Sequence, residues 1–200
     1  MRKPYDREGS ARMGYLEGYL ADVKRLVDDV PLGGVQRLVD LMADAWQDGR
    51  RVLLMGNGGS AATASHIVND LQKCIHLEAG RPLKTLCLSD CSPLVLAWAN
   101  DTEYANVYAP QIECWAEPGD LVIGISGSGN SANIVRAIET ANRLGAHTFG
   151  LAGHEGGRLG ETARDCIVVR SENMQQIEDL HMIVLHLAFS ALRERLRAAS

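Results

Sequence analysis

The feature that most constrains the fold is a regular alternation of short apolar runs with helical patterns from residue 51 onward. The first run, Val52 to Met55, contains no polar position, which is typical of a parallel strand buried on both faces. Four more such runs follow, and helical patterns separate them. Strands that alternate with helices predict an α/β fold, here a doubly wound five-stranded parallel sheet with helices on both faces.

The boundaries of these elements follow from periodicity and from Gly, Pro and Ser clusters. The expected strands are Val52 to Met55, Lys84 to Leu88, Asp120 to Ile125, His147 to Leu151 and Asp165 to Val169. The expected helices run from the first loop to Cys74, and over Pro93 to Asn100, Tyr104 to Ala116, Ser131 to Leu144 and Asn173 to Ala198. The two Gly-rich turns, at residues 56–60 and 126–131, then lie at the carboxyl ends of strands.

Two further helices are expected before the sheet, over Met13 to Asp29 and Gly34 to Asp48, with residues 1–10 as a loose lead-in. The first helix carries more apolar surface than a lone peripheral helix needs, and subunit packing would explain the excess. We expect one domain over residues 1–200. Within it, residues 1–50 form a helical segment for oligomer packing and residues 51–200 form the α/β sandwich.

Composition sets the class of protein. The 200 residues suit one α/β domain, and the net charge of −5 argues against a nucleic-acid partner. No apolar run approaches the roughly 18 residues of a membrane span, and no signal-peptide core follows the N-terminus. We therefore expect a cytoplasmic protein with no membrane partner. The five cysteines lack CxxC spacing, and most of them are expected to be small core residues.

Two Gly-rich turns, Gly56 to Ser60 and Ser126 to Ser131, each connect a strand to a helix. Such turns present backbone N–H groups and the positive end of a helix dipole to an anion. The simpler interpretation is a tight turn with Ser131 as an N-cap, but two equivalent loops favour a ligand site. Neither loop has a mononucleotide or dinucleotide signature, so we expect a small phosphorylated metabolite and no nucleotide cofactor.

Titratable groups occur at short helical spacings on two helices. His66 and Asp70 are separated by four residues, and Glu178, His181 and His186 lie on the last helix. Each group on its own is more simply a structural histidine or a solvated carboxylate. Two His/carboxylate pairs in one small domain instead indicate a zinc site or a proton-transfer pair.

Four motifs, in this order along the chain, resemble one known family. They are Gly56-Asn57-Gly58-Gly59-Ser60, Ala99-Asn100-Asp101, Ile125-Ser126-Gly127-Ser128-Gly129-Asn130-Ser131 and Glu178-Asp179-Leu180-His181 with His186. The chain resembles the sugar isomerase (SIS) domains, which have a flavodoxin-like sheet, and more closely the phosphoheptose isomerases. The resemblance covers nearly the whole chain.

This resemblance implies an isomerase that converts sedoheptulose 7-phosphate to a heptose 7-phosphate through an enediol. It implies a homotetramer with active sites between subunits, and one zinc ion per subunit. The residues that it implies as substrate contacts are Asn57, Gly58, Ser60, Asp101, Ser126, Gly127, Ser128, Ser131 and Gln175. The residues expected at the reacting carbons, and as metal ligands, are His66, Asp70, Glu178 and His186.

The sequence departs from the family pattern at three positions. Asp70 stands where the family has a glutamate that is a leading candidate for the catalytic base, and Glu178 stands where it has a glutamine. Gly127 replaces a threonine. If both helices border one site, either the base has moved from Asp70 to Glu178, or both carboxylates bind metal. Relocation of the base can change which face of the enediol is protonated, so the sequence leaves the configuration at C2 of the product open, and a heptose other than the common manno form is one alternative.

Two other functions remain open from the sequence. The first is a non-catalytic SIS protein that binds a phosphosugar or a partner protein as a regulator. The second is an isomerase or epimerase for an amino-sugar phosphate. The presence of His66, Asp70, Glu178 and His186 favours the heptose isomerase.

Overall fold

The structure is a computed structural model that describes the backbone of residues 5–198. The chain forms two compact units, Met1–Val30 and Pro31–Ser200. The first four residues of the expected lead-in lie outside the described residues. No helix in the described part of the chain is long and apolar enough to cross a membrane.

The first unit is a single helix, α1 (Tyr5–Asp28). The helix begins before the expected Met13, so the prediction of a loose lead-in was wrong for residues 5–10. This segment contains one glycine and no proline, and its charged residues tolerate helix well. Tyr15, Leu16 and Leu20 are more than half exposed on this helix.

The second unit contains the sheet and all remaining elements. The strands are β1 (Arg51–Gly56), β2 (Lys84–Cys87), β3 (Leu121–Ser126), β4 (His147–Gly153) and β5 (Asp165–Val169). The helices are α2 (Leu32–Gln47), α3 (Gly59–Asn69), the π-helix η1 (Asp70–Cys74), α4 (Ile75–Ala79), α5 (Ser92–Asp101), the 3₁₀ helix η2 (Tyr104–Asn106), α6 (Ala109–Trp115), α7 (Ala132–Arg143), α8 (Gly157–Thr162) and α9 (Met174–Ala198).

The sheet is parallel throughout, with the strand order β2-β1-β3-β4-β5. Val52 pairs with Leu121, and Leu121 in turn pairs with His147, so the central strands begin at one level. This is the flavodoxin-like order, and it confirms the predicted fold class. Each expected strand is present within about two residues of its predicted ends.

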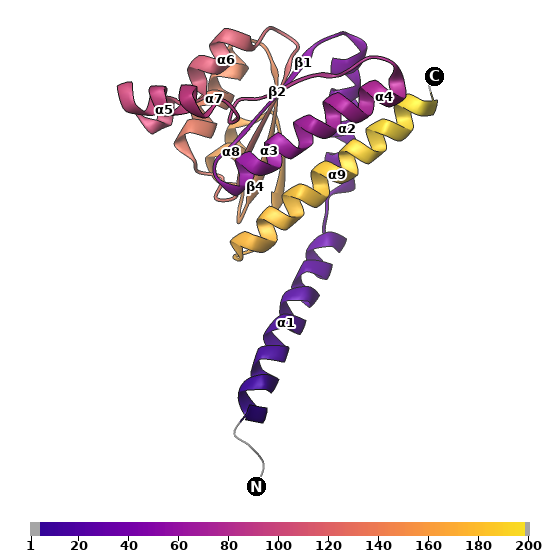
Figure 1. Ribbon diagram of the computed structural model, residues 1–200, viewed down its shortest axis with the longest axis vertical. Helices are drawn as coiled ribbons and strands as arrows, with labels where there is room; N and C mark the ends of the chain where they lie inside the picture. The colour runs from indigo at the N-terminus through magenta and orange to yellow at the C-terminus, as the bar shows by residue number, and fades with distance from the viewer. Residues whose placement is uncertain (1–4, 199–200) are drawn as a thin grey trace. The chain divides into compact units, whose positions relative to one another are not determined.

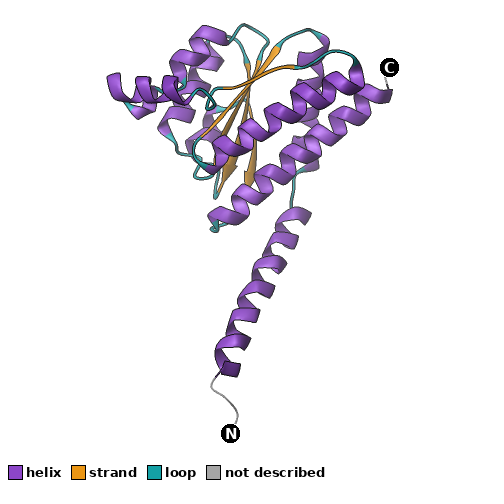
Figure 2. Cartoon of the chain, in the orientation of Figure 1, coloured by secondary structure: helices purple, strands orange, loops and turns teal. Residues whose placement is uncertain are grey.

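Helices cover both faces of the sheet, as Figure 1 shows. On one face α9 packs against both α2 and α3, and all three helices pack against the strands. On the other face α7 packs on β3 and β4, with α6 and α8 beside it. Figure 2 shows the strands enclosed between these two layers. The second helix of the expected N-terminal segment, α2, therefore belongs to the second unit. An oligomer-packing role for residues 1–50 stays a prediction.

Three local features were not predicted. The expected helix over Tyr104 to Ala116 is divided into η2 and α6, and Pro110 lies in the first turn of α6, where its missing N–H costs nothing. The helix after the first loop continues to Ala79 through the π-turn η1. The short helix α8 is rich in glycine, so its sequence carries little helical signal.

The last helix is joined to the sheet by a buried histidine. His181 is 1% exposed, and its Nε2 lies 3.0 Å from the carbonyl oxygen of Ala152 on β4. Nδ1 is buried and has no hydrogen-bond partner. Burial lowers the pKa of His181 below its usual 6.5, although the bond to Ala152 acts in the opposite direction. The ring is therefore a neutral hydrogen-bond donor that fixes α9 to the sheet. His181 is thus a structural histidine, which was the simpler of the two interpretations of the sequence.

This burial predicts an acid-dependent loss of stability. The unfolded chain binds a proton at His181 below about pH 6.5, and the folded chain does so only at lower pH. The free energy of unfolding should therefore fall as the pH decreases through this window. In the variant His181→Gln, whose amide can still donate to Ala152, the fall between about pH 7 and pH 5 should be smaller. Urea unfolding at several pH values measures both, and equal slopes would contradict the assignment.

Candidate functional site

The site lies where the strand order reverses. β1 and β3 are neighbours in the sheet, but β1 leads into α3 on one face and β3 leads into α7 on the other. The two connections therefore diverge and leave a crevice at the carboxyl ends of the strands, which is where ligands bind in such sheets. Both predicted loops border this crevice.

The first loop is a sharp turn that only glycine permits. A Cβ at Gly56 would lie 2.5 Å from the backbone of Ser60, and Gly58 has a φ of +53°. The N–H of Ser60 bonds to the carbonyl oxygen of Asn57 at 3.0 Å, which closes the turn onto the first residues of α3. Ser60 is 6% exposed, so its hydroxyl lies within the crevice wall rather than on the outer surface.

In the second loop, which we call the serine loop (residues 126–131), three hydroxyl groups converge. The Oγ of Ser126 donates to the Oγ of Ser131 at 3.0 Å and lies 3.5 Å from that of Ser128. Ser131 occupies the N-cap position of α7 but makes no side-chain hydrogen bond to the helix. The N-cap interpretation therefore holds for its position and not for its hydroxyl, which remains part of the polar cluster.

The serine loop is held by a second glycine turn that follows β4. Gly129 has a φ of +67°, and a Cβ there would overlap the carbonyl oxygen of Gly156. The carbonyl oxygen of Gly129 accepts a 2.8 Å bond from the N–H of Leu159, and the side chain of Asn130 accepts one from the N–H of Arg158 at 3.1 Å. These contacts fix the loop before any ligand binds.

The first turns of α9 lie against both loops. The sulfur of Met174 fills the space that a side chain at Gly127 would need, so glycine replaces the family's threonine here without leaving a void. One turn later, the carboxylate oxygens of Glu178 lie 3.0 and 3.1 Å from the position of a Cβ on Gly59. Glu178 therefore faces the positive end of α3 at the mouth of the first loop. Gln175, also expected to bind substrate, is exposed on the same helix.

His66, Asp70 and His186 form a second cluster of polar side chains, at the far end of α3. The Nε2 atoms of the two histidines are 2.9 Å apart, and each lies 3.6–3.7 Å from an oxygen of Asp70. The two imidazoles are nearly half exposed, with side-chain exposures of 48% and 45%, whereas Asp70 is 18% exposed. Asp70 is also the first residue of the π-turn η1, a feature that is frequent at functional sites.

Glu178 does not join this cluster in the described part of one chain. One ligand atom from each of His66, Asp70 and His186 lies within 4.8 Å of the others, and this group contains three residues, not the expected four. Glu178 and His186 are eight residues apart on α9, which is about 12 Å along a helix axis. Within a single chain, the two carboxylates therefore do not substitute for one another.

Asp101 is the last residue of α5 and is exposed. Its carboxylate accepts a 2.8 Å hydrogen bond from the side chain of Asn100. Three residues later, the hydroxyl of Tyr104 donates to Oδ1 of Asn57 at 3.0 Å, which ties this segment to the first loop. The position of Asp101 is thus next to a segment that reaches the crevice.

Sequence reasoning missed Asn133 and Tyr108, two polar residues behind the loops. Asn57 and Asn133 exchange two side-chain hydrogen bonds, of 3.0 and 2.8 Å. Tyr108 donates to the carbonyl oxygen of Gly56, and burial raises its pKa to about 12, so the phenol stays protonated. A signal was present in the sequence, because Asn133 is an amide in the first turn of a helix face that is mostly apolar.

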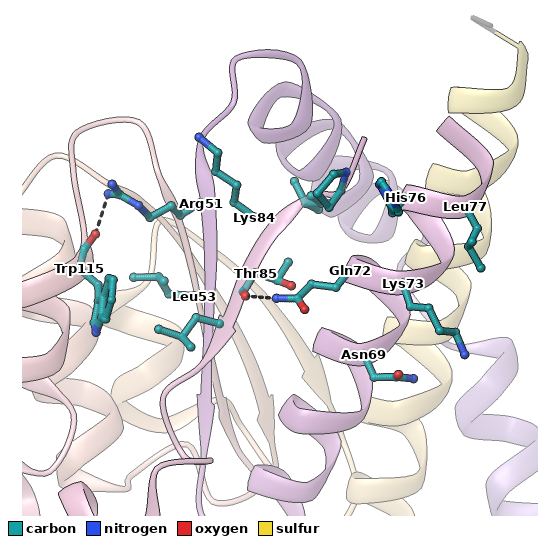
Figure 3. Close-up of a pocket in the computed structure, with 13 residues that line it drawn as sticks. Arg51, Leu53, Asn69, Gln72, Lys73, His76, Leu77, Lys84, Thr85 and Trp115 are labelled. Atoms are coloured by element: carbon teal, nitrogen blue, oxygen red, sulfur yellow. Dashed lines mark hydrogen bonds between the residues drawn. The ribbon is translucent and has the colours of Figure 1, made fainter. Parts of the chain in front are cut away.

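A cavity of about 720 Å³ lies elsewhere, beside the edge strand β2. Figure 3 shows Trp115 and Leu53 on one side of this strand, and on the other Gln72, whose amide donates to the carbonyl oxygen of Thr85 at 2.7 Å. No residue of either glycine-rich loop lines the cavity. It is distinct from the crevice.

Comparison with known proteins places these features in a family. The SIS domain family matches residues 18–153. A phosphoheptose isomerase of Geotalea daltonii is 37% identical over 162 residues, which is 81% of this chain and 84% of the relative. A probable phosphoheptose isomerase of Thermoplasma acidophilum is 34% identical over 88% of this chain and 97% of the relative.

Solved structures share the fold. The phosphoheptose isomerase of Francisella tularensis superposes with a TM-score of 0.83 at 24% identity, covering 96% of this chain and all of that one. That of Neisseria gonorrhoeae gives a TM-score of 0.82, also at 24% identity, over 90% and 97% of the two chains. At this identity the likeness supports the fold.

The packing of the serine loop yields a prediction for its two glycines. Gly129→Ala adds a Cβ where φ is positive and backbone blocks the space, so we expect a loss of more than about 2 kcal/mol in the free energy of unfolding. The one close contact of a Cβ in Gly127→Ala is with the flexible Met174 side chain, with Ile177 at an ordinary distance, and we expect a smaller loss. Thermal unfolding of both variants measures the difference, and equal losses would contradict the role of the Gly129–Gly156 contact.

Proposed function

The chain belongs to the phosphoheptose isomerase family of SIS-domain proteins, and from this we propose that it converts sedoheptulose 7-phosphate to a D-glycero-heptose 7-phosphate. The observation that carries the proposal is the pair of preorganised loops at the switch point, combined with an acid–base cluster of two histidines and an aspartate. We propose that the enzyme works in the cytoplasm, where sugar phosphates are made.

The phosphate is assigned to the serine loop. Ser126, Ser128 and Ser131 offer hydroxyl donors without charge, and the first N–H groups of α7 point to the same place. Ser60 and the backbone of Asn57 and Gly58 are assigned to the substrate from the opposite side. Gly127, Asp101 and Gln175 are assigned to further contacts with the sugar, on the strength of the family pattern.

The reaction needs one base at carbon and donors at two oxygens. A base takes a proton from C1 of the ketose, and the electron pair moves through the new C1–C2 double bond to the oxygen on C2. The resulting enediolate is protonated on oxygen. Return of a proton to C2, with loss of the proton on the C1 oxygen, gives the aldose. We assign the role of base at carbon to Glu178, which faces the loops. The proton transfers at the substrate's two oxygens are assigned to His66, Asp70 and His186.

The donor set of the three-residue cluster suits a zinc ion. Two imidazoles and one carboxylate, with a fourth position open, is a composition found in catalytic zinc sites. When bound there, zinc would supply a Lewis acid that polarises the substrate's oxygens. His66, Asp70 and His186 would hold it, and we propose one zinc per subunit.

The two halves of the site call for a second chain. Within one chain, the Glu178 end and the histidine end of α3 are about 10 Å apart along the helix, too far for both to act on adjacent carbons. The half-exposed cluster is flanked by Ile183 and Leu187, which are 37% and 41% exposed. We therefore propose a homotetramer in which the loops and Glu178 of one subunit face the His66, Asp70 and His186 cluster of another.

A non-catalytic regulator is the alternative function. A regulator needs the phosphate loops but not an acid–base cluster. The convergence of His66, Asp70 and His186 within 4.8 Å supports the enzyme instead.

We expect purified protein to consume sedoheptulose 7-phosphate and to form an aldose. In D₂O the product should carry deuterium at C2, because the proton that the base takes from C1 exchanges with solvent before a proton is returned to C2. NMR of the product gives the configuration at C2, which we expect to differ from the common manno form. Absence of turnover would favour the regulator.

The variant Glu178→Gln tests the base within the same assay. If Glu178 moves the carbon-bound proton, kcat should fall by about a hundredfold or more. Full turnover with unchanged deuterium incorporation would contradict this role and return the base to Asp70. Glu194→Gln, the same exchange at an exposed position near the other end of α9, is the matched control for the loss of a negative charge on this helix.

Metal content tests the cluster. Freshly purified protein should contain about one zinc per chain, and His186→Ala should lose most of it. Elemental analysis measures both. A fully active protein without metal would remove zinc from the proposal but leave the histidines as donors.

Mixed oligomers test the shared site. Ser128→Asp should exclude phosphate by repulsion, and Asp70→Asn should disable the other half, so each variant alone should be nearly inactive. Co-expression should restore activity at about a quarter of the sites, because random assembly pairs two intact halves in that fraction. No restoration, with mixed oligomers verified by mass spectrometry, would place the whole site within one chain.

A further inference from the structure

The crevice between the two loops is bridged by a pair of amide side chains. Asn57 Nδ2 donates to Oδ1 of Asn133 at 3.0 Å, and Asn133 Nδ2 donates to Oδ1 of Asn57 at 2.8 Å. Asn57 belongs to the first loop and Asn133 to the first turn of α7, directly after the serine loop. The pair therefore joins the two segments that diverge at the switch point.

The surroundings leave this pair no other arrangement. Asn133 is 2% exposed, and its Oδ1 also accepts a 3.0 Å bond from the N–H of Ile134. Oδ1 of Asn57 accepts from Tyr104 at 3.0 Å and lies 3.4 Å from the hydroxyl of Tyr108. A buried amide that loses its partner keeps the cost of desolvation, so the reciprocal arrangement is strongly favoured.

The end of β1 is fixed by the same group of residues. The hydroxyl of Tyr108 donates to the carbonyl oxygen of Gly56 at 2.5 Å, and Ser89 bonds to both the N–H and the carbonyl oxygen of that glycine, at 3.2 and 2.9 Å. Tyr108 is 2% exposed, and its raised pKa keeps it a donor. The strand end, the first loop and the start of α7 are thus one connected network.

We propose that Asn133 is a positioning residue, which acts through Asn57 to set the spacing between the first loop and the serine loop. The side chain of Asn57 is largely committed to this network, so its expected contact with substrate is made by the backbone. The inference rests on the proposed function, in which Ser60 and the serine loop hold one phosphate between them. A correct spacing lowers the cost of binding because the loops need no ordering when the ligand arrives.

The test compares two asparagines on the same helix. Asn133→Ala removes the bridge. Asn142→Ala, in the last turn of α7, removes bonds to Thr162 and Thr148 far from the loops. We expect Asn133→Ala to raise KM for sedoheptulose 7-phosphate by about tenfold, with a smaller change in kcat. Asn142→Ala should lower Tm by a similar amount and leave KM unchanged.

The affinity for inorganic phosphate provides a readout that does not depend on turnover. Calorimetric titration should give a Kd about tenfold weaker for Asn133→Ala than for the unmodified chain, and no change for Asn142→Ala. If the unmodified chain binds phosphate but has no isomerase activity, the proposed function is wrong. The comparison of phosphate affinities still tests the positioning role of Asn133 in that case. An unchanged phosphate Kd in a folded Asn133→Ala variant would overturn the positioning role.

Asn57→Ala breaks the same pair from its more exposed side, and it serves if Asn133→Ala does not fold. A double variant adds a check on the unit itself. If the two amides act together, the double variant should weaken phosphate binding no more than either single variant. Losses that multiply would show that each amide acts separately, which would contradict the proposed bridge.

Discussion

The reversal of strand order between β1 and β3 is the constraint on which the rest of the site depends. A parallel sheet can extend from a central strand in both directions only if the connecting helices pass over opposite faces. The backbone leaving β1 and that leaving β3 must therefore separate at the sheet edge. Ligands bind in the open space that results in sheets of this kind, but the two loops no longer pack against each other there. The amide pair of Asn57 and Asn133 restores that contact with two hydrogen bonds.

Close backbone contacts hold the serine loop in place, just as the amide pair holds the two sides of the crevice together. Gly129 rests against Gly156, and the contact is so close that no side chain fits between them. The turn after β4 therefore supports the loop, and its free surface presents hydroxyl groups rather than charged groups to the phosphate that we propose it binds. Met174 completes this arrangement by occupying the space above Gly127. The threonine-to-glycine change in the loop and the methionine at the start of α9 thus form one packing solution.

Much of this could be predicted from the sequence, because strand burial and loop glycines act locally. The apolar run at Val52 specified a strand buried on both faces, and the sheet has the expected parallel order. Contacts between distant segments could not be predicted. Nothing in the sequence indicates that Asn133 faces Asn57, which is 76 residues earlier in the chain. The same limit applies to Glu178. Its spacing to His186 along one helix follows from the sequence, but its contact with Gly59 could not be predicted from it.

The parallel course of α3 and α9 decides how these residues act together. Glu178 meets Gly59 near the start of both helices, and His186 meets His66 two turns later. One carboxylate thus stays with the phosphate loops and the other with the histidines. A shift of either helix cannot bring them together, because His181 bonds α9 to the sheet at Ala152, between these two contacts. The proposed active site, which uses both groups, is therefore assigned to two copies of the chain, and the exposed apolar residues beside the histidines are where we expect the second copy to bury surface.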